Sequence, residues 1–166
     1  TDQGVATDVT LNAGTQTASV KNIGANADIN AVSITAGTIS TNGTITTAIE
    51  EDGGNLGNVT LTGAVSLAGA TAIDTSSNGG TVGIVGGIDG GNTLTITSGS
   101  GAVDISSTVG GTNALSALKI NEGSGNTGTI AINNVGDGTP ANGVTGLTVL
   151  GNANTSSLTT DGTNYD

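Results

Sequence analysis

Aliphatic residues in this chain recur in short triplets whose middle residue is polar. Three such triplets fall within one stretch, separated by corners rich in Gly, Ser, Thr and Asn: Leu94–Ile96, Val103–Ile105 and Leu118–Ile120. Because successive side chains of a β-strand point to opposite sides, each triplet directs two aliphatic residues to one side and one polar residue to the other. The pattern predicts short strands with one apolar and one solvated face, and the whole stretch predicts one coil of a parallel β-helix.

Comparable triplets recur along the chain at a loose period. The best of them begin at Val9, Val32, Val59, Leu94, Leu118 and Leu147. Repetition of one short unit is typical of a solenoid, in which each coil stacks on the next. The long gaps from Val59 to Leu94 and from Leu118 to Leu147 are expected to hold loop insertions, in the glycine-rich runs 78–91 and 136–143 respectively. We predict a single β-solenoid segment over residues 1–166, with about six or seven coils and a length of roughly 30 Å at ~4.8 Å per coil.

The middle residues of these six triplets are polar and are expected to share one outer face: Thr10, Ser33, Thr60, Thr95, Lys119 and Thr148. Regular threonine arrays on flat solenoids can bind ice, but Lys119 interrupts this row. The high β-propensity of threonine explains the hydroxyl groups without a ligand. We therefore expect a solvated face here rather than a binding site.

The composition favours a narrow interior. The chain has 30 Gly, one Tyr (Tyr165), and no Cys, Met, Trp, Phe or His. Aromatic side chains normally supply bulk to a globular core, at ~150–250 Å² each. An interior of Val, Ile, Leu and Ala suits a slender tube that is repeated many times. The abundance of Gly, Ser, Asn and Thr would also fit a disordered chain, but the regular return of aliphatic residues argues against disorder.

The charge balance excludes several classes of partner. The formal net charge is −11, and Lys21 and Lys119 are the only basic residues. A surface for phosphate groups cannot be assembled from two lysines, so nucleic acid and anionic bilayers are not expected partners. No apolar run is long enough to predict a membrane span. The acidity fits a soluble surface that repels its own copies.

The residues needed for most catalytic sites are missing from the sequence. Without His or Cys, the many Ser and Thr hydroxyl groups have no partner base. A polysaccharide-acting β-helix enzyme would use paired carboxylates, but its cleft would also need basic and sugar-stacking aromatic residues. We predict that the chain is not an enzyme and assign it no catalytic, cofactor-binding or metal-binding residue.

Three local motifs are each better explained without a ligand. Gly86–Leu94 is similar to a calcium-binding nonapeptide, but it occurs once and its glycine spacing differs, so a turn is expected and no cofactor is predicted. The acidic loop Glu50–Asp52 is expected to be solvated rather than to bind a metal. Glycosylation patterns at Asn42, Asn58 and Asn154 are expected by chance in a chain this rich in Asn and Thr.

Residues 91–120 resemble the repeats of very large secreted bacterial surface proteins, the filamentous-haemagglutinin-like and autotransporter-passenger-like adhesins. In those repeats a leu-thr-val strand is followed by gly-x-gly-x-val, by a gly-gly-thr-x-x-leu corner and by leu-x-val. The corresponding segments here are Leu94–Ile96, Ser98–Val103, Gly110–Leu115 and Leu118–Ile120. The resemblance extends over residues 57–120. It implies a right-handed parallel β-helix on a bacterial cell surface, and it transfers no functional residue, because the pattern marks structural positions only.

These observations predict a structural or adhesive extracellular module of a large bacterial cell-surface or secreted protein. It is expected to act as a stiff, acidic rod that extends from the surface and presents its polar faces outward. The open ends of a solenoid invite pairing with another strand, so the expected partners are neighbouring coils, copies of the chain end to end, and a host or neighbouring-cell surface. The alternative is a self-polymerising subunit of an extracellular fibre or sheath, and a polysaccharide-acting enzyme is a distant third.

Overall fold

The computed structural model describes residues 7–25, 29–48, 57–77, 79–122, 127–137, 142–149 and 158–160. These residues form twelve strands in one continuous sheet, and no helix occurs among them. The strands are β1 (Thr7–Asn12), β2 (Thr17–Val20), β3 (Ile29–Thr46), β4 (Val59–Asp74), β5 (Val82–Val85), β6 (Ile88–Asp89), β7 (Thr93–Thr97), β8 (Val103–Val109), β9 (Ala117–Ile120), β10 (Ile130–Val135), β11 (Leu147–Val149) and β12 (Leu158–Thr160).

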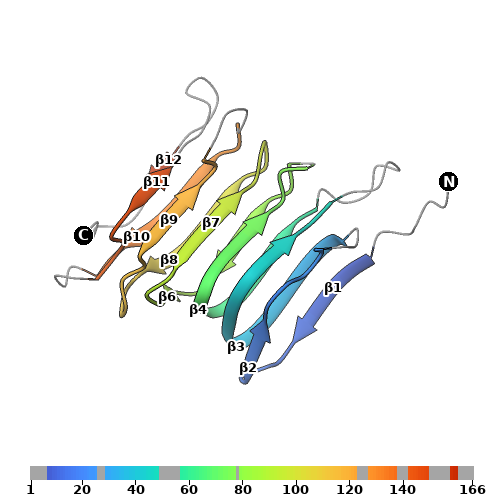
Figure 1. Ribbon diagram of the computed structural model, residues 1–166, viewed down its shortest axis with the longest axis horizontal. Helices are drawn as coiled ribbons and strands as arrows, with labels where there is room; N and C mark the ends of the chain where they lie inside the picture. Colours follow the sequence, from blue (N-terminus) through green and yellow to red (C-terminus); the bar gives the residue numbers. More distant parts are fainter. Residues whose placement is uncertain are drawn as a thin grey trace.

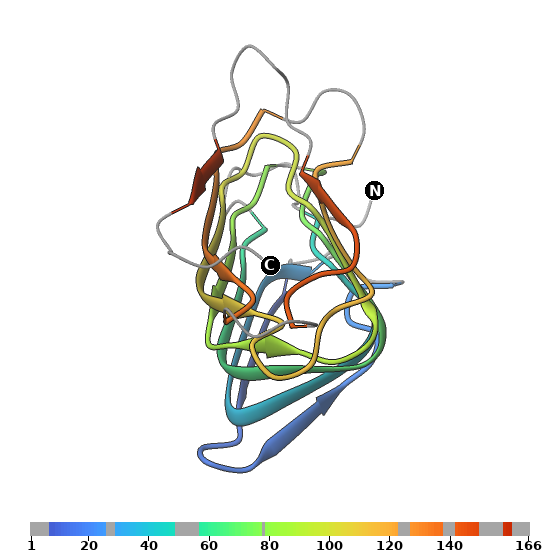
Figure 2. The ribbon, with the colours of Figure 1, turned by 90° about the vertical axis from the view of Figure 1, so that its left-hand side faces the viewer.

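The chain winds as a parallel β-solenoid. All strand pairs in the described residues are parallel and join neighbouring coils, so the ribbon in Figure 1 shows a ladder of slanted strands along the rod. Viewed end on, the same strands form the walls of a tube (Figure 2). The predicted all-β solenoid is confirmed, but it makes about five turns rather than six or seven.

Three faces enclose the tube. Face A contains β1, residues 29–35 of β3, residues 59–62 of β4, β5, the starts of β8 and β10, and β12. Face B contains β2, residues 38–41 of β3, residues 64–67 of β4, β6 and the ends of β8 and β10. Face C contains residues 43–46 of β3, residues 71–74 of β4, β7, β9 and β11. The long strands β3 and β4 bend around the tube and contribute to all three faces.

The interior is filled by columns of aliphatic side chains. Two columns on face A are 2% exposed or less: Val32, Val59, Val82, Val103 and Ile130, and beside them Ile34, Leu61, Ile84, Ile105 and Ile132. The core cluster of the described residues contains only Val, Ile, Leu and Ala. The narrow, aromatic-free interior predicted from composition is therefore confirmed.

The predicted coil from Leu94 to Ile120 is also confirmed. Leu94 pairs with Leu118, and Ile96 pairs with Ile120, so the two triplets lie in register on face C. Between them the chain passes through β8, which belongs to faces A and B. One turn of the solenoid therefore separates these two triplets.

The predicted alignment of all six triplets is wrong at one step. Val9, Val32 and Val59 share a column on face A, whereas Leu94, Leu118 and Leu147 share a column on face C. The partner of Val59 in the next coil is Val82, not Leu94. The run 78–91 contains β5 and β6 instead of a loop insertion. The error arises because strands on different faces carry the same apolar-polar-apolar pattern.

Glycines allow the coils to approach each other closely at the corners. Gly63 has a φ of +132°, and a Cβ atom added there would lie 1.9 Å from the carbonyl oxygen of Ala36 in the previous coil. A Cβ atom on Gly101 would lie 2.1 Å from the carbonyl oxygen of Gly80. Side chains at these positions would push the coils apart, so glycine keeps the corner stacked.

Candidate functional site

The outer faces of the rod carry the polar middle residues of the triplets, but not in the single row that the sequence predicted. Thr10, Ser33 and Thr60 lie in register on face A, and the row continues through Gly83, Asp104 and Ala131. On face C the corresponding row is Thr44, Ala72, Thr95 and Lys119, and Thr148 is the backbone register partner of Lys119. The predicted row of hydroxyl groups is therefore split between two faces, and Lys119 is not on the face that carries Thr10.

The first three coils of face A carry two neighbouring rows of uncharged polar residues. The second row, two positions further along each strand, consists of Asn12, Thr35 and Thr62. Val85, which is 52% exposed, occupies the next position of this row in β5, where the first row has Gly83. The hydroxyl pattern therefore ends after three coils, which is too short for a regular array over the whole face.

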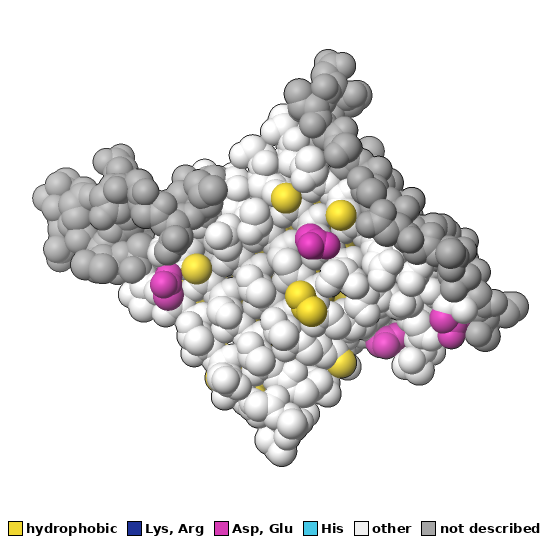
Figure 3. Space-filling view, turned by 180° about the vertical axis from the view of Figure 1, so that it is seen from behind, with side chains coloured by type: hydrophobic (Ala, Val, Ile, Leu, Met, Phe, Trp, Pro, Cys, Tyr) yellow, Lys and Arg dark blue, Asp and Glu magenta, His cyan; other side chains and the backbone are white. Residues whose placement is uncertain are grey.

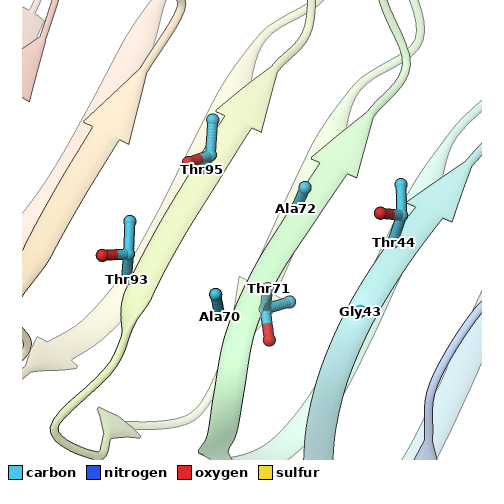
Figure 4. A pocket seen from close by; sticks show the side chains of 7 residues that line it. All are labelled: Gly43, Thr44, Ala70, Thr71, Ala72, Thr93 and Thr95. Carbon is cyan, nitrogen blue, oxygen red and sulfur yellow. The ribbon is translucent and has the colours of Figure 1, made fainter.

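A shallow hollow lies on face C where two alanines stand between threonine-bearing strands (Figure 4). Its floor is formed by Ala70 and Ala72 of β4, and it is lined on either side by Thr44 of β3 and by Thr93 and Thr95 of β7. The hollow exists because β4 has methyl groups where its neighbours have larger side chains. No charged residue lines it, so it offers weak contacts and no acid, base or nucleophile pair.

A second hollow lies on face A between β8 and β10. Its polar lining residues are Asp104, Ser106 and Asn133, and Ala131 lies beside them. Ser106 Oγ donates to the carbonyl oxygen of Ile84 at 3.4 Å, and Asn133 Nδ2 donates to the carbonyl oxygen of Ser106 at 3.4 Å. Two of these polar groups are thus engaged between coils. A lone carboxylate beside them does not make an acid–base pair.

Several charged groups elsewhere on the described surface have local structural partners. Asp89, within the segment Gly86–Leu94 that is similar to a calcium-binding nonapeptide, accepts hydrogen bonds at Oδ1 from the backbone N–H groups of Thr112 at 2.8 Å and Asn113 at 3.0 Å. The segment contains β6 and a corner. The described residues contain no group of three or more metal-ligating side chains, and the loop Glu50–Asp52 lies outside them.

Of the three asparagines in the glycosylation patterns, the two in the described residues lie in different environments. Asn58 Oδ1 accepts hydrogen bonds from the N–H of Thr81 at 2.8 Å and from its hydroxyl group at 3.0 Å. Asn42 is exposed on β3, and Asn154 lies outside the described residues. Lys119 forms an ion pair with Glu122, with 3.1 Å between Nζ and Oε2. On the face seen in Figure 3, hydrophobic and acidic side chains are scattered singly rather than gathered into a patch.

Sequence reasoning missed a column of buried polar residues at the corner between faces C and A. The column consists of Thr47, Thr75, Ser98 and Asn121, and each residue is 1% exposed or less. In three successive coils its hydroxyl groups donate to a glycine carbonyl oxygen across the corner: Thr47 to Gly57, Thr75 to Gly80 at 2.5 Å and Ser98 to Gly101 at 2.7 Å. Asn121 Oδ1 accepts from the N–H of Ser98 at 2.7 Å, and so the column links neighbouring coils.

A repeated sequence signal for this column does exist. Thr47, Thr75 and Ser98 each follow a buried isoleucine of face C by two residues. A polar residue that recurs at an inward-facing position marks a corner where the backbone needs a hydrogen-bond donor. The column is structural, since its hydroxyl groups are buried and bonded to the backbone.

Comparison with family models, with curated proteins and with solved structures gives no match to this chain. Within the described ranges there is also no helix that is long and apolar enough to cross a membrane.

Proposed function

We propose that this chain is a structural or adhesive module of a large bacterial cell-surface or secreted protein, in which it acts as a stiff rod for reach and surface contact. The observation that carries the proposal is the continuous parallel ladder from β1 to β12, wrapped around an aliphatic core. At ~4.8 Å per coil, about five turns make a rod of roughly 25 Å. Such a unit extends in one dimension and gains length with every coil.

Side chains at the corners support the stiffness of this rod. Asn92 Nδ2 donates to the carbonyl oxygen of Leu67 at 2.9 Å, and Asn22 Oδ1 accepts from the N–H of Thr44 at 2.9 Å. Each bond joins one coil to its neighbour and adds to the backbone ladder. Bending or twisting the rod would have to break such bonds together with the packed columns, so a rigid spacer is the role that fits best.

The outer surface supports display rather than catalysis. The outward positions on faces A and C carry mainly small polar residues, and the two hollows on them are shallow and hold no acid–base pair. A net charge of −11 keeps such a rod soluble and away from other acidic surfaces. We propose an extracellular location and contact with a host or neighbouring-cell surface, and no enzymatic activity.

A self-polymerising subunit of an extracellular fibre or sheath is the second candidate. Leu11 is 39% exposed although its register partner in the next coil, Ile34, is completely buried. A further strand, from a second copy or from an adjoining coil of a longer chain, would bury this side chain.

The two candidates differ in the size of the native polypeptide. Immunoblotting of the cell-derived protein under denaturing conditions should show a species of hundreds of kilodaltons for the module, and one near 15.6 kDa for the fibre subunit. Antibodies against the folded chain should label intact cells in both cases. Detection only after the cells are lysed would contradict a surface role, and labelling with an antibody against a cytoplasmic protein controls for leakage.

A further inference from the structure

We infer that the corner between faces C and A is a loop-insertion corner, at which a buried hydrogen bond holds each coil closed whatever the length of the loop outside it. The bond joins the hydroxyl group of a residue after face C to the carbonyl oxygen of a glycine before face A, as from Thr75 to Gly80 at 2.5 Å. The rod can therefore change the segments that it presents along this edge while its shape stays the same. This inference goes beyond the proposed function and holds for either candidate role.

The hydroxyl–glycine bond is the same in three successive coils, although the chain between its two residues differs in length. The bond spans ten, five and three positions in the pairs Thr47–Gly57, Thr75–Gly80 and Ser98–Gly101. All six of these residues are buried. Donor and acceptor thus stay the same while the chain between them more than triples in length, so the contact does not depend on the loop.

The chain is also fixed to the next coil on both sides of the loop. Before the loop, the N–H of Thr75 donates to the carbonyl oxygen of Thr97 at 2.8 Å. After the loop, the N–H of Val82 donates to the carbonyl oxygen of Ala102 at 2.8 Å. The hydroxyl–glycine bond therefore closes a gap whose two ends are already in register. A longer loop then costs only its own closure entropy, which grows slowly with length.

The corner between faces A and B has a nearly constant length. The second aliphatic column of face A and the column that begins face B are three to five positions apart: Ile34–Ile39, Leu61–Val65, Ile84–Ile88, Ile105–Val109 and Ile132–Val135. The N–H of Val65 donates to the carbonyl oxygen of Gly87 at 2.8 Å, and a Cβ atom on Gly86 would lie 2.2 Å from the carbonyl oxygen of Gly63. Residues inserted here would separate groups that are in contact.

The corner between faces B and C also varies in length, but its side-chain contacts differ between coils. It takes six and nine positions in successive coils, over Ile88–Leu94 and Val109–Leu118. Asn22 Oδ1 accepts from the N–H of Thr44, whereas Asp89 Oδ1 accepts from the N–H of Thr112. The recurrent hydroxyl–glycine bond therefore distinguishes the corner between faces C and A.

An insert of about eight Gly and Ser residues between Gly99 and Ser100 tests the tolerance of this corner. Closure entropy should raise the equilibrium constant for unfolding by about tenfold, and Tm, followed by circular dichroism, should fall by about 3–6 °C. The same insert between Gly86 and Gly87 is the matched control, and it should lower Tm at least about twice as far or abolish cooperative unfolding, because backbone bonds are broken. Equal falls in the two variants, or loss of the fold in the first, would overturn the inference.

A double-mutant cycle tests whether the hydroxyl group holds the corner. In the unsubstituted chain the short loop itself keeps Gly101 close, and the N–H of Gly101 donates to the carbonyl oxygen of Ser98 at 2.9 Å. With the insert this tether is lost, so we expect S98A to raise the unfolding constant about threefold more with the insert than without it. S98T retains the hydroxyl group, as in Thr47 and Thr75, and should show no such coupling. Additive effects of S98A and the insert, or equal coupling in S98T, would overturn the inference.

Proteolysis tests whether an inserted segment is presented outside the coil. An insert between Gly99 and Ser100 that carries the recognition sequence of a specific protease should be cut in the folded chain at a rate close to that of a free peptide. Circular dichroism of the same sample shows that the chain is folded. Cutting that is slower than the peptide by about tenfold or more would place the insert against the rod and would overturn its presentation at this edge.

Discussion

The buried hydroxyl column at the corner between faces C and A gives a sharp test of what holds the coils together. Thr75 is 1% exposed, and its hydroxyl group donates to the carbonyl oxygen of Gly80 at 2.5 Å. The T75V substitution keeps the shape and volume of the side chain and removes only the hydroxyl donor. The variant therefore isolates the corner hydrogen bond from the packing of the aliphatic columns.

The expected loss of stability in T75V arises because the carbonyl oxygen of Gly80 is left without a hydrogen-bond donor. A buried acceptor left without its donor costs about 1–3 kcal/mol, because it has lost water without gaining a partner. We therefore expect T75V to lower the free energy of unfolding by about 2 kcal/mol. In a chain of this size each kcal/mol corresponds to about 2–4 °C, so Tm should fall by about 4–8 °C.

Thermal and urea unfolding followed by far-ultraviolet circular dichroism measure this loss. T75S retains the hydroxyl group and should keep most of the hydrogen-bond contribution. T60V is the matched surface control, because Thr60 lies on the same strand and is exposed, so its effect should stay within about 0.5 kcal/mol. The reasoning would be refuted if T75V were as stable as the unsubstituted chain, or if T60V lost as much.

Two further pairs of variants test the packing of the coils by the same unfolding measurements. G101A should destabilise the chain by about 1–3 kcal/mol or more, because its Cβ atom would lie 2.1 Å from the carbonyl oxygen of Gly80. G83T should stabilise the chain by up to about 1 kcal/mol, because a Cβ atom on Gly83 meets nothing within 4 Å and threonine favours strands. I105A should cost about 2–5 kcal/mol, because Ile105 is completely buried in a central coil, whereas V85A should change little, since Val85 is 52% exposed. Equal effects within either pair would contradict the assigned inward and outward positions.

The fold class could be predicted because each triplet by itself shows the alternation of inward-facing aliphatic and outward-facing polar side chains. Val59–Leu61 and Leu94–Ile96 both show it, and both are strands with buried ends. The face to which a triplet belongs could not be predicted in the same way. It depends on how many residues each corner uses, and two identical triplets on different faces carry no local mark that separates them. An alignment of triplets by spacing therefore skips the coil that contains β5.

The buried polar column at the corner between faces C and A could not be predicted, although its three hydroxyl residues recur at a fixed position after a buried isoleucine. Whether such a residue points inward depends on the fold. Thr47, Thr75 and Ser98 look like ordinary surface residues of a Thr-rich and Ser-rich chain. Only the path of the backbone around the tube turns them inward, where a glycine carbonyl group needs a donor. The outer rows were mispredicted for a related reason, since Thr60 and Thr95 share a pattern but not a face.

Between coils of the solenoid, hydrogen bonds form only from one coil to the next, and this arrangement has a genetic consequence. A duplication that copies one registered interval, such as that from Val59 to Val82, would insert a rung whose ends already match the ladder on both sides. A deletion of the same interval would rejoin two compatible rungs. Recombination between repeats can therefore lengthen or shorten the molecule in whole steps and change its span while its cross-section stays the same.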